Sequence, residues 1–570
     1  MTEHRWCWTE VLGILILLGM LIGQCLWGIQ THSPTSDEQN HISRGYNYLV
    51  TGRLDLNVAP PFVNALSALP LLAHPEIVIP DYDVTHRRTF INQFAEEFVW
   101  VYNDARTIIN SGRLAIVFLS VLLAVFVHRW ARDLWGPAAG LLALFLYVLD
   151  PNIVAHSHLV TTDLGVACLG FIATYFLWRF LQGRKRTDLA QAGVVLGLAL
   201  ATKQSALLLV PLFVAIVAFE AAVRQDCRLR NPEAQPQNPK GQQSVRSLQF
   251  MAAVLLVLAL TTFLALWASY RFETAALSAP KTEHVTIDRL ISVPWVREIA
   301  YRLAESPIVP FPTYFSGIAW LRRYAQRGAP AFLMGQQSTR GWWYYFLVAF
   351  AIKTPLPTLI LLAAACFGWR RLRKPGPREY VLYVPIVAYF GVSFLRLLNI
   401  GYRHILVVLP FAFVIASSVV TGIRRKGTRL AMVGLCLWLL VSTVRISPHY
   451  LAYFNELIGG PRNGFRYLVD SNLDWGQDLE NLKRYMDRHG IPAVRLAYFG
   501  SARPDYYGIV SQPVPLTKPD GLENGPAEVY AISATLLQNG YLDDRLAFSW
   551  LREYEPFAHV GYSILLFHLP

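Results

Sequence analysis

The sequence predicts an α-helical protein that crosses a membrane about eleven times and ends in a small α/β domain. Hydrophobic residues make up 54% of the 570 residues and charged residues only 16%, whereas soluble globular chains are about 25% charged. Apolar runs that suit ~30 Å of hydrocarbon recur up to residue 446 and are missing from 447–570. This composition excludes a disordered or fibrous protein and argues against an ordinary soluble enzyme.

Eleven apolar segments are the predicted membrane spans, although several are short or merge with a neighbour. The first run follows Arg5, and no small-x-small cleavage site comes after it, so we interpret it as an uncleaved anchor. The predicted spans are 9–28, 111–128, 136–150, 164–182, 190–203, 205–223, 248–270, 341–369, 380–398, 404–423 and 430–446.

The net charge of +13 is concentrated in short loops between the spans. Six such segments hold 20 Lys and Arg against 6 Asp and Glu, whereas 447–570 holds 10 basic and 14 acidic residues. Basic loops of this kind mark the cytoplasmic side, so we expect a multi-pass protein of the cell (plasma) membrane with its N-terminus in the cytoplasm. A basic stripe for nucleic acid is not indicated. The basic segments are 1–8, 129–135, 183–189, 224–247, 370–379 and 424–429.

This topology predicts two domains. Residues 1–446 form the transmembrane domain, with long external loops at 29–110 and 271–340, and loops of that length are usually functional. Residues 447–570 form a soluble extracytoplasmic α/β domain. Hydrophobic spacing predicts a helix at 476–489, and β-favouring residues predict strands at 495–499, 528–533 and 563–568.

Several common kinds of site are missing from the sequence. The six cysteines fall in predicted spans or cytoplasmic segments and form no CxxC pair, so neither a disulfide framework nor a cysteine zinc site is expected. No P-loop, dinucleotide fingerprint, GxSxG or HExxH motif occurs. Nucleotide-driven transport and common hydrolase chemistry therefore lose support.

Carboxylates beside the membrane are the first candidates for chemistry, because charge at this position is costly. Asp37 and Glu38 follow the first span, and Asp163 precedes the fourth span on the same side. A partly desolvated carboxylate there can act as a general base. The alternative for Asp37-Glu38 is a solvated acidic pair, and the alternative for Asp163 is a helix cap.

Cations at the same face are the second group. Lys203, Arg403 and His404 lie at predicted outer ends of spans, where the positive-inside rule does not explain them. Arg binds phosphate through two bonds and Lys as a point charge, so the group suits an anionic headgroup. For each residue alone, the alternative is contact with lipid phosphate or with a structural carboxylate.

A polar segment of the tail is the third group. Residues 470–478 combine carboxylates, amides and an indole, which are groups that hydrogen-bond to sugars and stack on them. The Gly and Glu spacing of a calcium-binding EF-hand loop is absent. The alternative is a turn that leads into the following helix. The candidate sugar-binding residues are Asp470, Asn472, Asp474, Trp475 and Gln477.

Together these motifs resemble the GT-C glycosyltransferases of the protein O-mannosyltransferase and aminoarabinose lipid A transferase group, in a bacterial branch. The resemblance covers most of residues 30–480. One motif departs from it, because related chains often carry His-Pro-Pro where this chain has Ala59-Pro60-Pro61. The similar segments are Asp37-Glu38, Ala155-His156-Ser157 to Thr162-Asp163, Thr202-Lys203-Gln204-Ser205, Lys353-Thr354-Pro355, Gly401-Tyr402-Arg403-His404 and the block from Pro448 to Asp478.

The resemblance implies a GT-C fold and a mannosyltransferase-like enzyme of the cell envelope. Its donor would be a polyprenyl-phosphate-linked sugar, and its acceptor a hydroxyl of a protein, lipid or glycan. Asp37 would act as general base in an inverting reaction, Glu38 would support the first loop, and Asp163 would orient the acceptor or a cation. A divalent metal ion is left open. The donor phosphate would be bound by Lys203, Tyr402, Arg403 and His404, and the acceptor or sugar by His156 and His158 with the tail residues.

Two other classes of protein compete with this reading. A lipid-linked sugar flippase or secondary transporter needs polar residues near the midplane and broken helices. Lys353 with Pro355 and Pro357 is the feature that suits it best. A non-catalytic assembly protein whose tail binds glycan is the third alternative.

Overall fold

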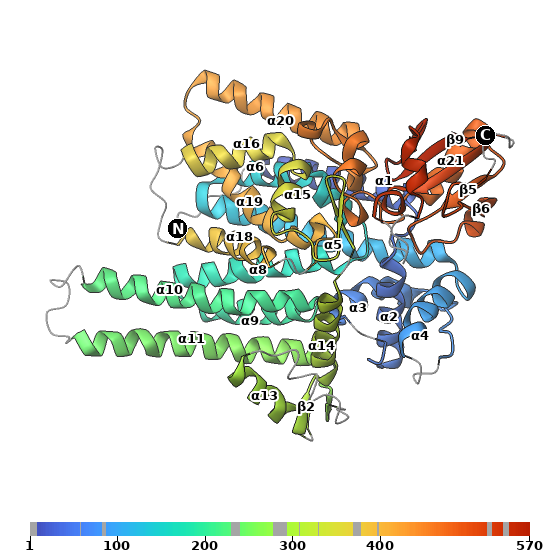
Figure 1. The fold of residues 1–570 in the computed structure, drawn as a ribbon. Coiled ribbons are helices and arrows are strands. Elements are labelled where there is room, and N and C mark those ends of the chain that lie inside the picture. The colour runs from blue at the N-terminus through green and yellow to red at the C-terminus, as the bar shows by residue number, and fades with distance from the viewer. Residues whose placement is uncertain are drawn as a thin grey trace.

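The computed structural model describes most of the chain. Its described ranges are 8–56, 59–82, 87–229, 240–277, 293–306, 308–328, 330–368, 378–395, 398–520, 527–539 and 547–569. The chain is mainly helical, and a small sheet near its C-terminal end lies at one side of the molecule (Figure 1). The predicted fold class, a helical membrane protein with a small C-terminal α/β part, is confirmed.

Six helices in the described ranges are long and apolar enough to cross a membrane, or seven spans if a bent pair counts as one. The bent pair meets at 109°, where the extended residues Thr354 and Pro355 separate two apolar helices. The predicted count of eleven is not confirmed. The six helices are α1 (Trp8–Thr31), α5 (Ala105–Trp135), α8 (Thr162–Gly183), α10 (Leu209–Leu229), α11 (Lys240–Ser269) and α20 (Lys426–Ile446), and the bent pair is α15 (Tyr345–Lys353) with α16 (Leu356–Ala363).

Shorter helices fill the spaces between these spans. Four of the predicted spans correspond to helices of 10 to 15 residues, too short to cross ~30 Å of hydrocarbon at 1.5 Å per residue. These helices are α6 (Pro137–Val148), α9 (Arg186–Leu200), α18 (Tyr380–Ser393) and α19 (Val408–Ser417), and the short turns near them are α7 (Pro151–His156), η4 (Gln204–Leu208), η6 (Ala364–Gly368), η7 (Tyr402–Ile405) and η8 (Ser418–Gly422).

The helices differ in how much of their surface faces the protein. In α8, 89% of the apolar stretch is buried by neighbouring helices, against 22% in α1 and in α20 and 17% in α11. A helix that is apolar but largely exposed suits a lipid surface, so α1, α11 and α20 belong at the rim and α8 at the centre. Glycines let α9 and α11 approach closely, since a Cβ on Gly197 would lie 2.5 Å from the Thr262 carbonyl oxygen.

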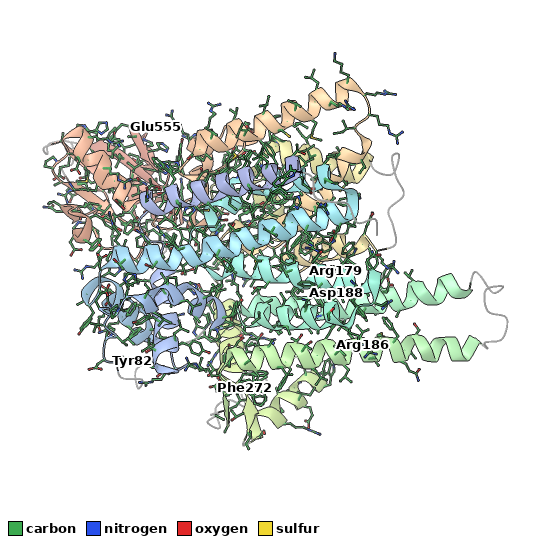
Figure 2. The ribbon with its side chains drawn as sticks, turned by 180° about the vertical axis from the view of Figure 1, so that it is seen from behind. Tyr82, Arg179, Arg186, Asp188, Phe272 and Glu555 are labelled. Carbon is green, nitrogen blue, oxygen red and sulfur yellow. The ribbon has the colours of Figure 1, made fainter. Side chains whose placement is uncertain are left out.

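The predicted external segments gather at one end of the long helices. Figure 2 shows Tyr82 and Glu555 toward one side of the molecule and Arg179, Arg186 and Asp188 toward the other. The elements of 29–110 are α2 (Glu38–Thr51), α3 (Phe62–Ala68), η1 (Leu69–Ala73), α4 (Arg87–Glu96) and η3 (Glu97–Val101). The elements of 271–340 are β1 (Thr274–Ala275), α13 (Pro294–Glu305), β2 (Val309–Pro310), α14 (Pro312–Arg327), β3 (Ala331–Leu333) and β4 (Gln336–Ser338).

The tail holds a five-stranded mixed sheet in the order β6-β5-β7-β9-β8. Strand β5 is parallel to β6 and β7, whereas β9 is antiparallel to β7 and β8. The predicted helix and three strands are confirmed, with the helix starting three residues later than expected. The elements are α21 (Leu479–His489), β5 (Val494–Ala497), η13 (Asp505–Tyr507), β6 (Ser511–Pro513), β7 (Glu528–Ser533), α22 (Ala534–Asn539), η15 (Ser549–Glu553), β8 (Ala558–Val560) and β9 (Ile564–Leu569).

Residues 447–478, here called the connecting segment, join α20 to the sheet and pack into the helical core. Its backbone carbonyls at Trp475 and Gln477 accept hydrogen bonds of 3.0 Å from the amides of Ser36 and Ser33. The segment therefore lies directly against the stretch that carries Asp37. Its short turns are η9 (Tyr450–Ala452), η10 (Glu456–Ile458), η11 (Pro461–Arg466) and η12 (Asp470–Asn472).

Candidate active site

Two helix N-termini bring the candidate carboxylates to the external end. Asp37 immediately precedes α2, and Asp163 is the second residue of α8. The positive end of a helix dipole stabilises a carboxylate in the first turn, which gives both residues a local reason for their places. The Asp37 side chain is 41% exposed, whereas the Asp163 side chain is 4% exposed.

Arg403 joins these two carboxylates. Its Nη1 lies 2.9 Å from Asp37 Oδ2 and 3.8 Å from Asp163 Oδ2. Lys203 Nζ donates to the other oxygen of Asp163 at 2.6 Å. Four charged side chains from four separate segments thus meet in one cluster. The sequence predicts that all four lie at one face of the membrane.

The guanidinium of Arg403 is held from one side by an aromatic ring. Its Cζ lies 4.1 Å from the ring centre of Trp475, a cation–π contact supplied by the connecting segment. Arg403 Nε and His404 Nε2 are buried without a hydrogen-bond partner among the described residues. A buried polar atom without a hydrogen bond costs free energy. A ligand that bonded to these two nitrogens would remove that cost.

Asp37 is ionised at neutral pH. Partial burial is the strongest influence and raises the pKa of Asp37, but the guanidinium of Arg403 and the ring of His41 outweigh it and bring the pKa below its ordinary value. No described residue donates a hydrogen bond to Asp37 Oδ1. This oxygen is therefore available to take a proton.

Glu38 has a different environment from its neighbour. It is fully buried and paired with Arg113, whose Nε and Nη2 donate to its two oxygens at 2.9 and 2.8 Å. The amides of Val160 and Thr35 donate to the same carboxylate at 2.9 and 2.8 Å. Burial raises the pKa of Glu38, but the charge of Arg113 and these hydrogen bonds lower it below the ordinary value. Both oxygens of Glu38 are engaged in the fold.

The candidate histidines lie inside the protein. His156 is 2% exposed and packs edge-on to Trp475, while His158 stacks with His32. Burial lowers the pKa of His156 to about 3 and that of His158 to about 4, so both rings are neutral at physiological pH. His156 lies beside the charged cluster, whereas His158 contacts a separate group of histidines.

Tyr402 faces away from the cluster although it precedes Arg403. Its side chain is 1% exposed, and its hydroxyl lies 2.9 Å from Thr354 Oγ1. Its amide donates to Asn472 Oδ1 at 2.8 Å. These contacts place Tyr402 in the packing that supports Arg403.

The candidate sugar-binding residues of the tail divide into those near the charged cluster and those that bond within the fold. Trp475 contacts Arg403. Burial of Arg403 lowers the pKa of its guanidinium, but the charges of Asp37, Asp163 and Asp470 outweigh burial and raise this pKa above its ordinary value. Asn472, Asp474 and Gln477 are buried and bonded to the protein itself. Asp474 Oδ2 accepts from the Thr535 amide at 2.9 Å, and burial raises the pKa of Asp474 to about 7.

Lys353 is buried at the break between α15 and α16. Its Nζ donates to the carbonyl of Leu451 at 2.9 Å and also to that of Asn472, and it lies 4.6 Å from the Phe454 ring centre. All three partners belong to the connecting segment. The broken helix that suits a transporter is thus held by contacts within the fold.

Sequence reasoning missed several residues around the site. Arg113 lies inside an apolar helix, where a single cation gives no sign of its partner. His41 and Arg44 lie about one and two turns along α2 and interact electrostatically with Asp37. Tyr324 of α14 interacts electrostatically with Asp470 and Asp37 and is 41% exposed. One signal for them was available in the sequence: His41 and Arg44 follow Glu38 after three and six residues, a spacing that puts them on one helix face.

The family of dolichyl-phosphate-mannose-protein mannosyltransferases matches residues 105–233 of this chain. That stretch contains Asp163 and Lys203, both in the cluster. The match confirms the predicted resemblance over these residues and, with it, the predicted class, a membrane glycosyltransferase. None of the curated proteins matches the chain.

Solved structures give weaker likenesses. ArnT from Cupriavidus metallidurans bound to undecaprenyl phosphate is 14% identical, over 98% of this chain and 97% of that one, with a TM-score of 0.43. The oligosaccharyltransferase of Archaeoglobus fulgidus in the apo form is 13% identical, over 85% and 60%, with a TM-score of 0.41. AglB from the same organism, in complex with an inhibitory peptide and a dolichol-phosphate, is 14% identical, over 87% and 60%, with a TM-score of 0.42.

Proposed function

We propose that this protein transfers a sugar from a polyprenyl-phosphate-linked donor to an acceptor hydroxyl, with inversion at the anomeric carbon. The observation that carries the proposal is the single nitrogen of Arg403 that contacts both Asp37 and Asp163. That contact puts a base, an orienting carboxylate and a phosphate-binding cation within reach of one reacting centre.

Asp37 is the general base of the proposed reaction. It is ionised, half exposed and free at one oxygen, whereas Asp163 is buried and paired with Lys203. The acceptor hydroxyl gives its proton to Asp37 as its oxygen forms the new bond to the anomeric carbon. The bond from that carbon to the phosphate oxygen breaks on the opposite face, and polyprenyl phosphate leaves with the electron pair.

Arg403 and Lys203 bind the phosphate and stabilise the negative charge that it gains. The guanidinium already lies over the Trp475 ring, so its position is set before the donor arrives. Arg403 Nε and His404 Nε2 supply two further polar contacts. A phosphate monoester anion is a good leaving group, so no second carboxyl is needed to protonate it, in contrast to glycosidases.

Glu38 is a positioning residue in this proposal. Its five hydrogen bonds from Arg113, Val160 and Thr35 hold the start of α2, and hence the Asp37 backbone, against α5. Asn472 and Gln477 position Tyr402 and Trp475 through backbone hydrogen bonds. The tail thus supports the site from outside the helical core.

A divalent metal ion does not fit the cluster as it stands. Two carboxylates face two cations there, and Lys203 and Arg403 contact three of the four carboxylate oxygens, which leaves a hard cation too few ligands. The proposed steps are therefore assigned to side chains alone.

We place the site at the outer face of the plasma membrane, with a cytoplasmic N-terminus. The support is the distribution of charge: Arg186, in the basic segment 183–189, lies toward the side of the molecule away from Tyr82 and Glu555 (Figure 2), and basic segments of this kind stay in the cytoplasm. The acceptor, whether protein, lipid or glycan, would then approach past α14 and the tail.

The test is release of polyprenyl phosphate from a polyprenyl-phosphate sugar by purified protein in liposomes, with membrane extract as the source of acceptors. Native protein should release it, Asp37→Asn should not, and the exposed control Asp487→Asn should match the native protein. Equal release by Asp37→Asn would remove Asp37 as the base. Translocation of labelled lipid without release would favour the transporter.

A further inference from the structure

We propose that His32, His449 and Asp478 bind a divalent transition-metal ion, Zn²⁺, which fastens the tail to the helical core. His32 follows α1, whereas His449 and Asp478 lie at the start and the end of the connecting segment, more than 400 residues further along the chain. None of them belongs to the cluster around Arg403, so this inference does not depend on the proposed function.

The ligand atoms are already close to the spacing that zinc requires. One ring nitrogen of each histidine and one carboxylate oxygen all lie within 4.8 Å of one another. The shortest pair, His449 Nδ1 and Asp478 Oδ1, is 3.3 Å apart. Tetrahedral Zn–N and Zn–O bonds of ~2.0–2.1 Å place neighbouring ligand atoms about 3.3 Å apart. The other two pairs lie within 4.8 Å, so they would have to close by up to ~1.5 Å as the ion binds.

Hydrogen bonding fixes the tautomer of His32. His158 Nδ1 lies 2.8 Å from the Val154 carbonyl oxygen, which can only accept, so the proton of His158 is on Nδ1. His158 Nε2 must then accept, and its partner at 3.4 Å is Nδ1 of His32. The proton of His32 is therefore on Nδ1, and a lone pair is left on Nε2.

That lone pair has no other use in the fold. His32 is 5% exposed, and its Nε2 makes no hydrogen bond to any described residue. His449 Nδ1 also makes none, although it lies 3.3 Å from a carboxylate oxygen. Metal-binding histidines commonly donate their second N–H to an outer acceptor, as His32 does toward His158.

Asp478 is held in place for this role. It is fully buried, its Oδ2 accepts from Ser563 Oγ at 2.7 Å and its Oδ1 accepts from Asn481 Nδ2 at 2.7 Å. Gly561 packs so tightly on the carboxylate that a Cβ there would lie 2.0 Å from it. Two imidazoles and one fixed carboxylate are a ligand set that suits zinc, with a fourth position for water.

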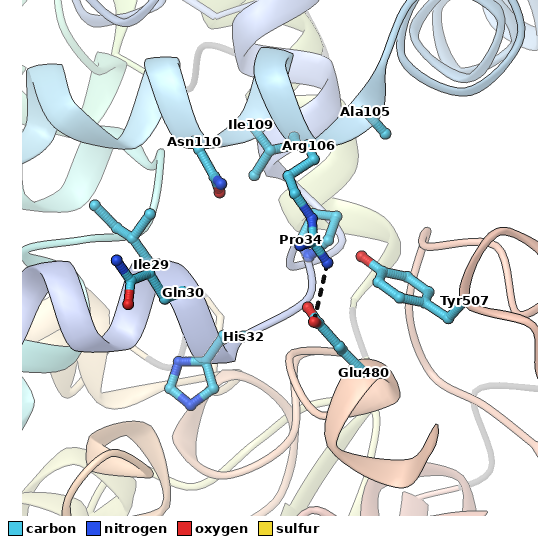
Figure 3. Close-up of a pocket in the computed structure, with 10 residues that line it drawn as sticks. All are labelled: Ile29, Gln30, His32, Pro34, Ala105, Arg106, Ile109, Asn110, Glu480 and Tyr507. Carbon is cyan, nitrogen blue, oxygen red and sulfur yellow. Dashed lines mark hydrogen bonds and ion pairs between the residues drawn. The ribbon is translucent and has the colours of Figure 1, made fainter. Parts of the chain in front are cut away.

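A route to the site exists from the solvent. A cavity of about 110 Å³ opens beside His32, between the ends of α1, α5 and α21. Figure 3 shows His32 at its wall and an ion pair of 3.0 Å from Arg106 Nη2 to Glu480 Oε1 across it. The His449 side chain is 24% exposed. An ion can therefore enter without unfolding the tail.

The experiment is metal analysis of the full-length protein, purified in detergent through a peptide tag that binds no metal, without chelator. We expect about one equivalent of zinc per chain. His449→Gln and His32→Gln should abolish it, and His158→Leu should weaken zinc binding by ~10–100-fold, as loss of an outer-shell partner does. His489→Gln, an exposed histidine of α21, is the matched control and should keep the zinc.

The second measurement is thermal unfolding before and after chelation. Chelator should lower the midpoint of the native protein and of His489→Gln, and leave His449→Gln unchanged; re-added zinc should restore the first two. Co²⁺ loaded into the native protein should give the absorption of a tetrahedral nitrogen–oxygen site. Native protein that takes up no zinc, or His449→Gln that binds as much as the control, would overturn the proposal. Either result is decisive if the variants unfold at the same temperature as the chelated native protein.

Discussion

Adjacent carboxylates with opposite roles give the sharpest test of the site. Asp37 is half exposed and contacts Arg403, whereas Glu38 is fully buried and holds Arg113 by two charged hydrogen bonds. We expect Asp37→Asn to lose activity but keep its stability, and Glu38→Gln to lose stability first. The same charge is removed in each variant, one residue apart.

The magnitudes follow from burial. Removing one partner of a buried pair leaves an uncompensated charge, which costs about 3–5 kcal/mol, so Glu38→Gln should lower the free energy of unfolding by that order. An exposed pair contributes roughly 0–1 kcal/mol, and Arg403 keeps Asp163 in Asp37→Asn. Loss of a general base slows turnover by about 10²–10⁴-fold.

The assay pairs thermal unfolding in detergent, followed by tryptophan fluorescence, with polyprenyl phosphate release in liposomes. Asp37→Asn should unfold like the native protein and turn over at the background rate. Glu38→Gln should unfold at a clearly lower temperature, and its remaining folded fraction should still turn over. A stable but inactive Glu38→Gln, beside an active Asp37→Asn, would refute the assignment of the two roles.

Three further outcomes are expected. Arg403→Lys keeps the charge but loses the guanidinium contact with the Trp475 ring, so kcat/KM for donor should fall by about 10²-fold with unchanged thermal unfolding. An unchanged kcat/KM would contradict a phosphate-binding role. Because Arg403 lowers the pKa of Asp37, moving Arg403 onto the phosphate should raise it, so the acid limb of kcat should lie at higher pH than that of kcat/KM; coincident limbs would count against the exchange. Burial raises the pKa of Asp474 to about 7, so the folded state binds the proton of this carboxyl more tightly than the unfolded state, and the stability that it contributes is full below pH ~4 and is lost as pH rises toward 7. Asp474→Asn should therefore reduce the fall of the unfolding midpoint with pH over that interval, whereas an unchanged slope would assign the effect to another group.

The sequence allowed the charged cluster to be predicted because its members lie next to apolar runs. Asp163 and Lys203 flank predicted spans, and topology alone puts them at one face with Asp37 and Arg403. Arg113 could not be found in the same way. It is the ninth residue of α5, and only the tertiary fold brings Glu38 to it.

The number of spans was harder to predict, because apolar composition does not separate a membrane span from a buried helix. The run 136–150 is apolar all round, yet α6 is only 12 residues long and lies against α1, α5 and α19. The run 341–369 looked continuous, but Pro355 removes a backbone donor and the helix turns by 109° there. Only packing decides such cases.

The tail was predicted as a separate unit because its composition changes at 447. The predicted strands of the tail are present, but Asn472, Trp475 and Gln477 were expected to face a sugar and two of them are fully engaged by the protein. Side chains with several donors and acceptors suit a ligand and a turn equally well. The direction of Asn472 comes partly from Tyr345, 127 residues away, whereas Gln477 is held by Leu473 and Asp478 of its own segment.

The hydrogen bonds between Ser33 and the connecting segment also set a schedule for biosynthesis. Ser33 Oγ donates to the Gly476 carbonyl at 3.0 Å, across 443 residues of sequence. At a translation rate of about 5–20 residues per second, roughly 20–90 s pass between the synthesis of the two partners. During that interval the stretch that carries Asp37 lacks its Trp475 support, so we expect the proposed site to form only after the connecting segment has been made.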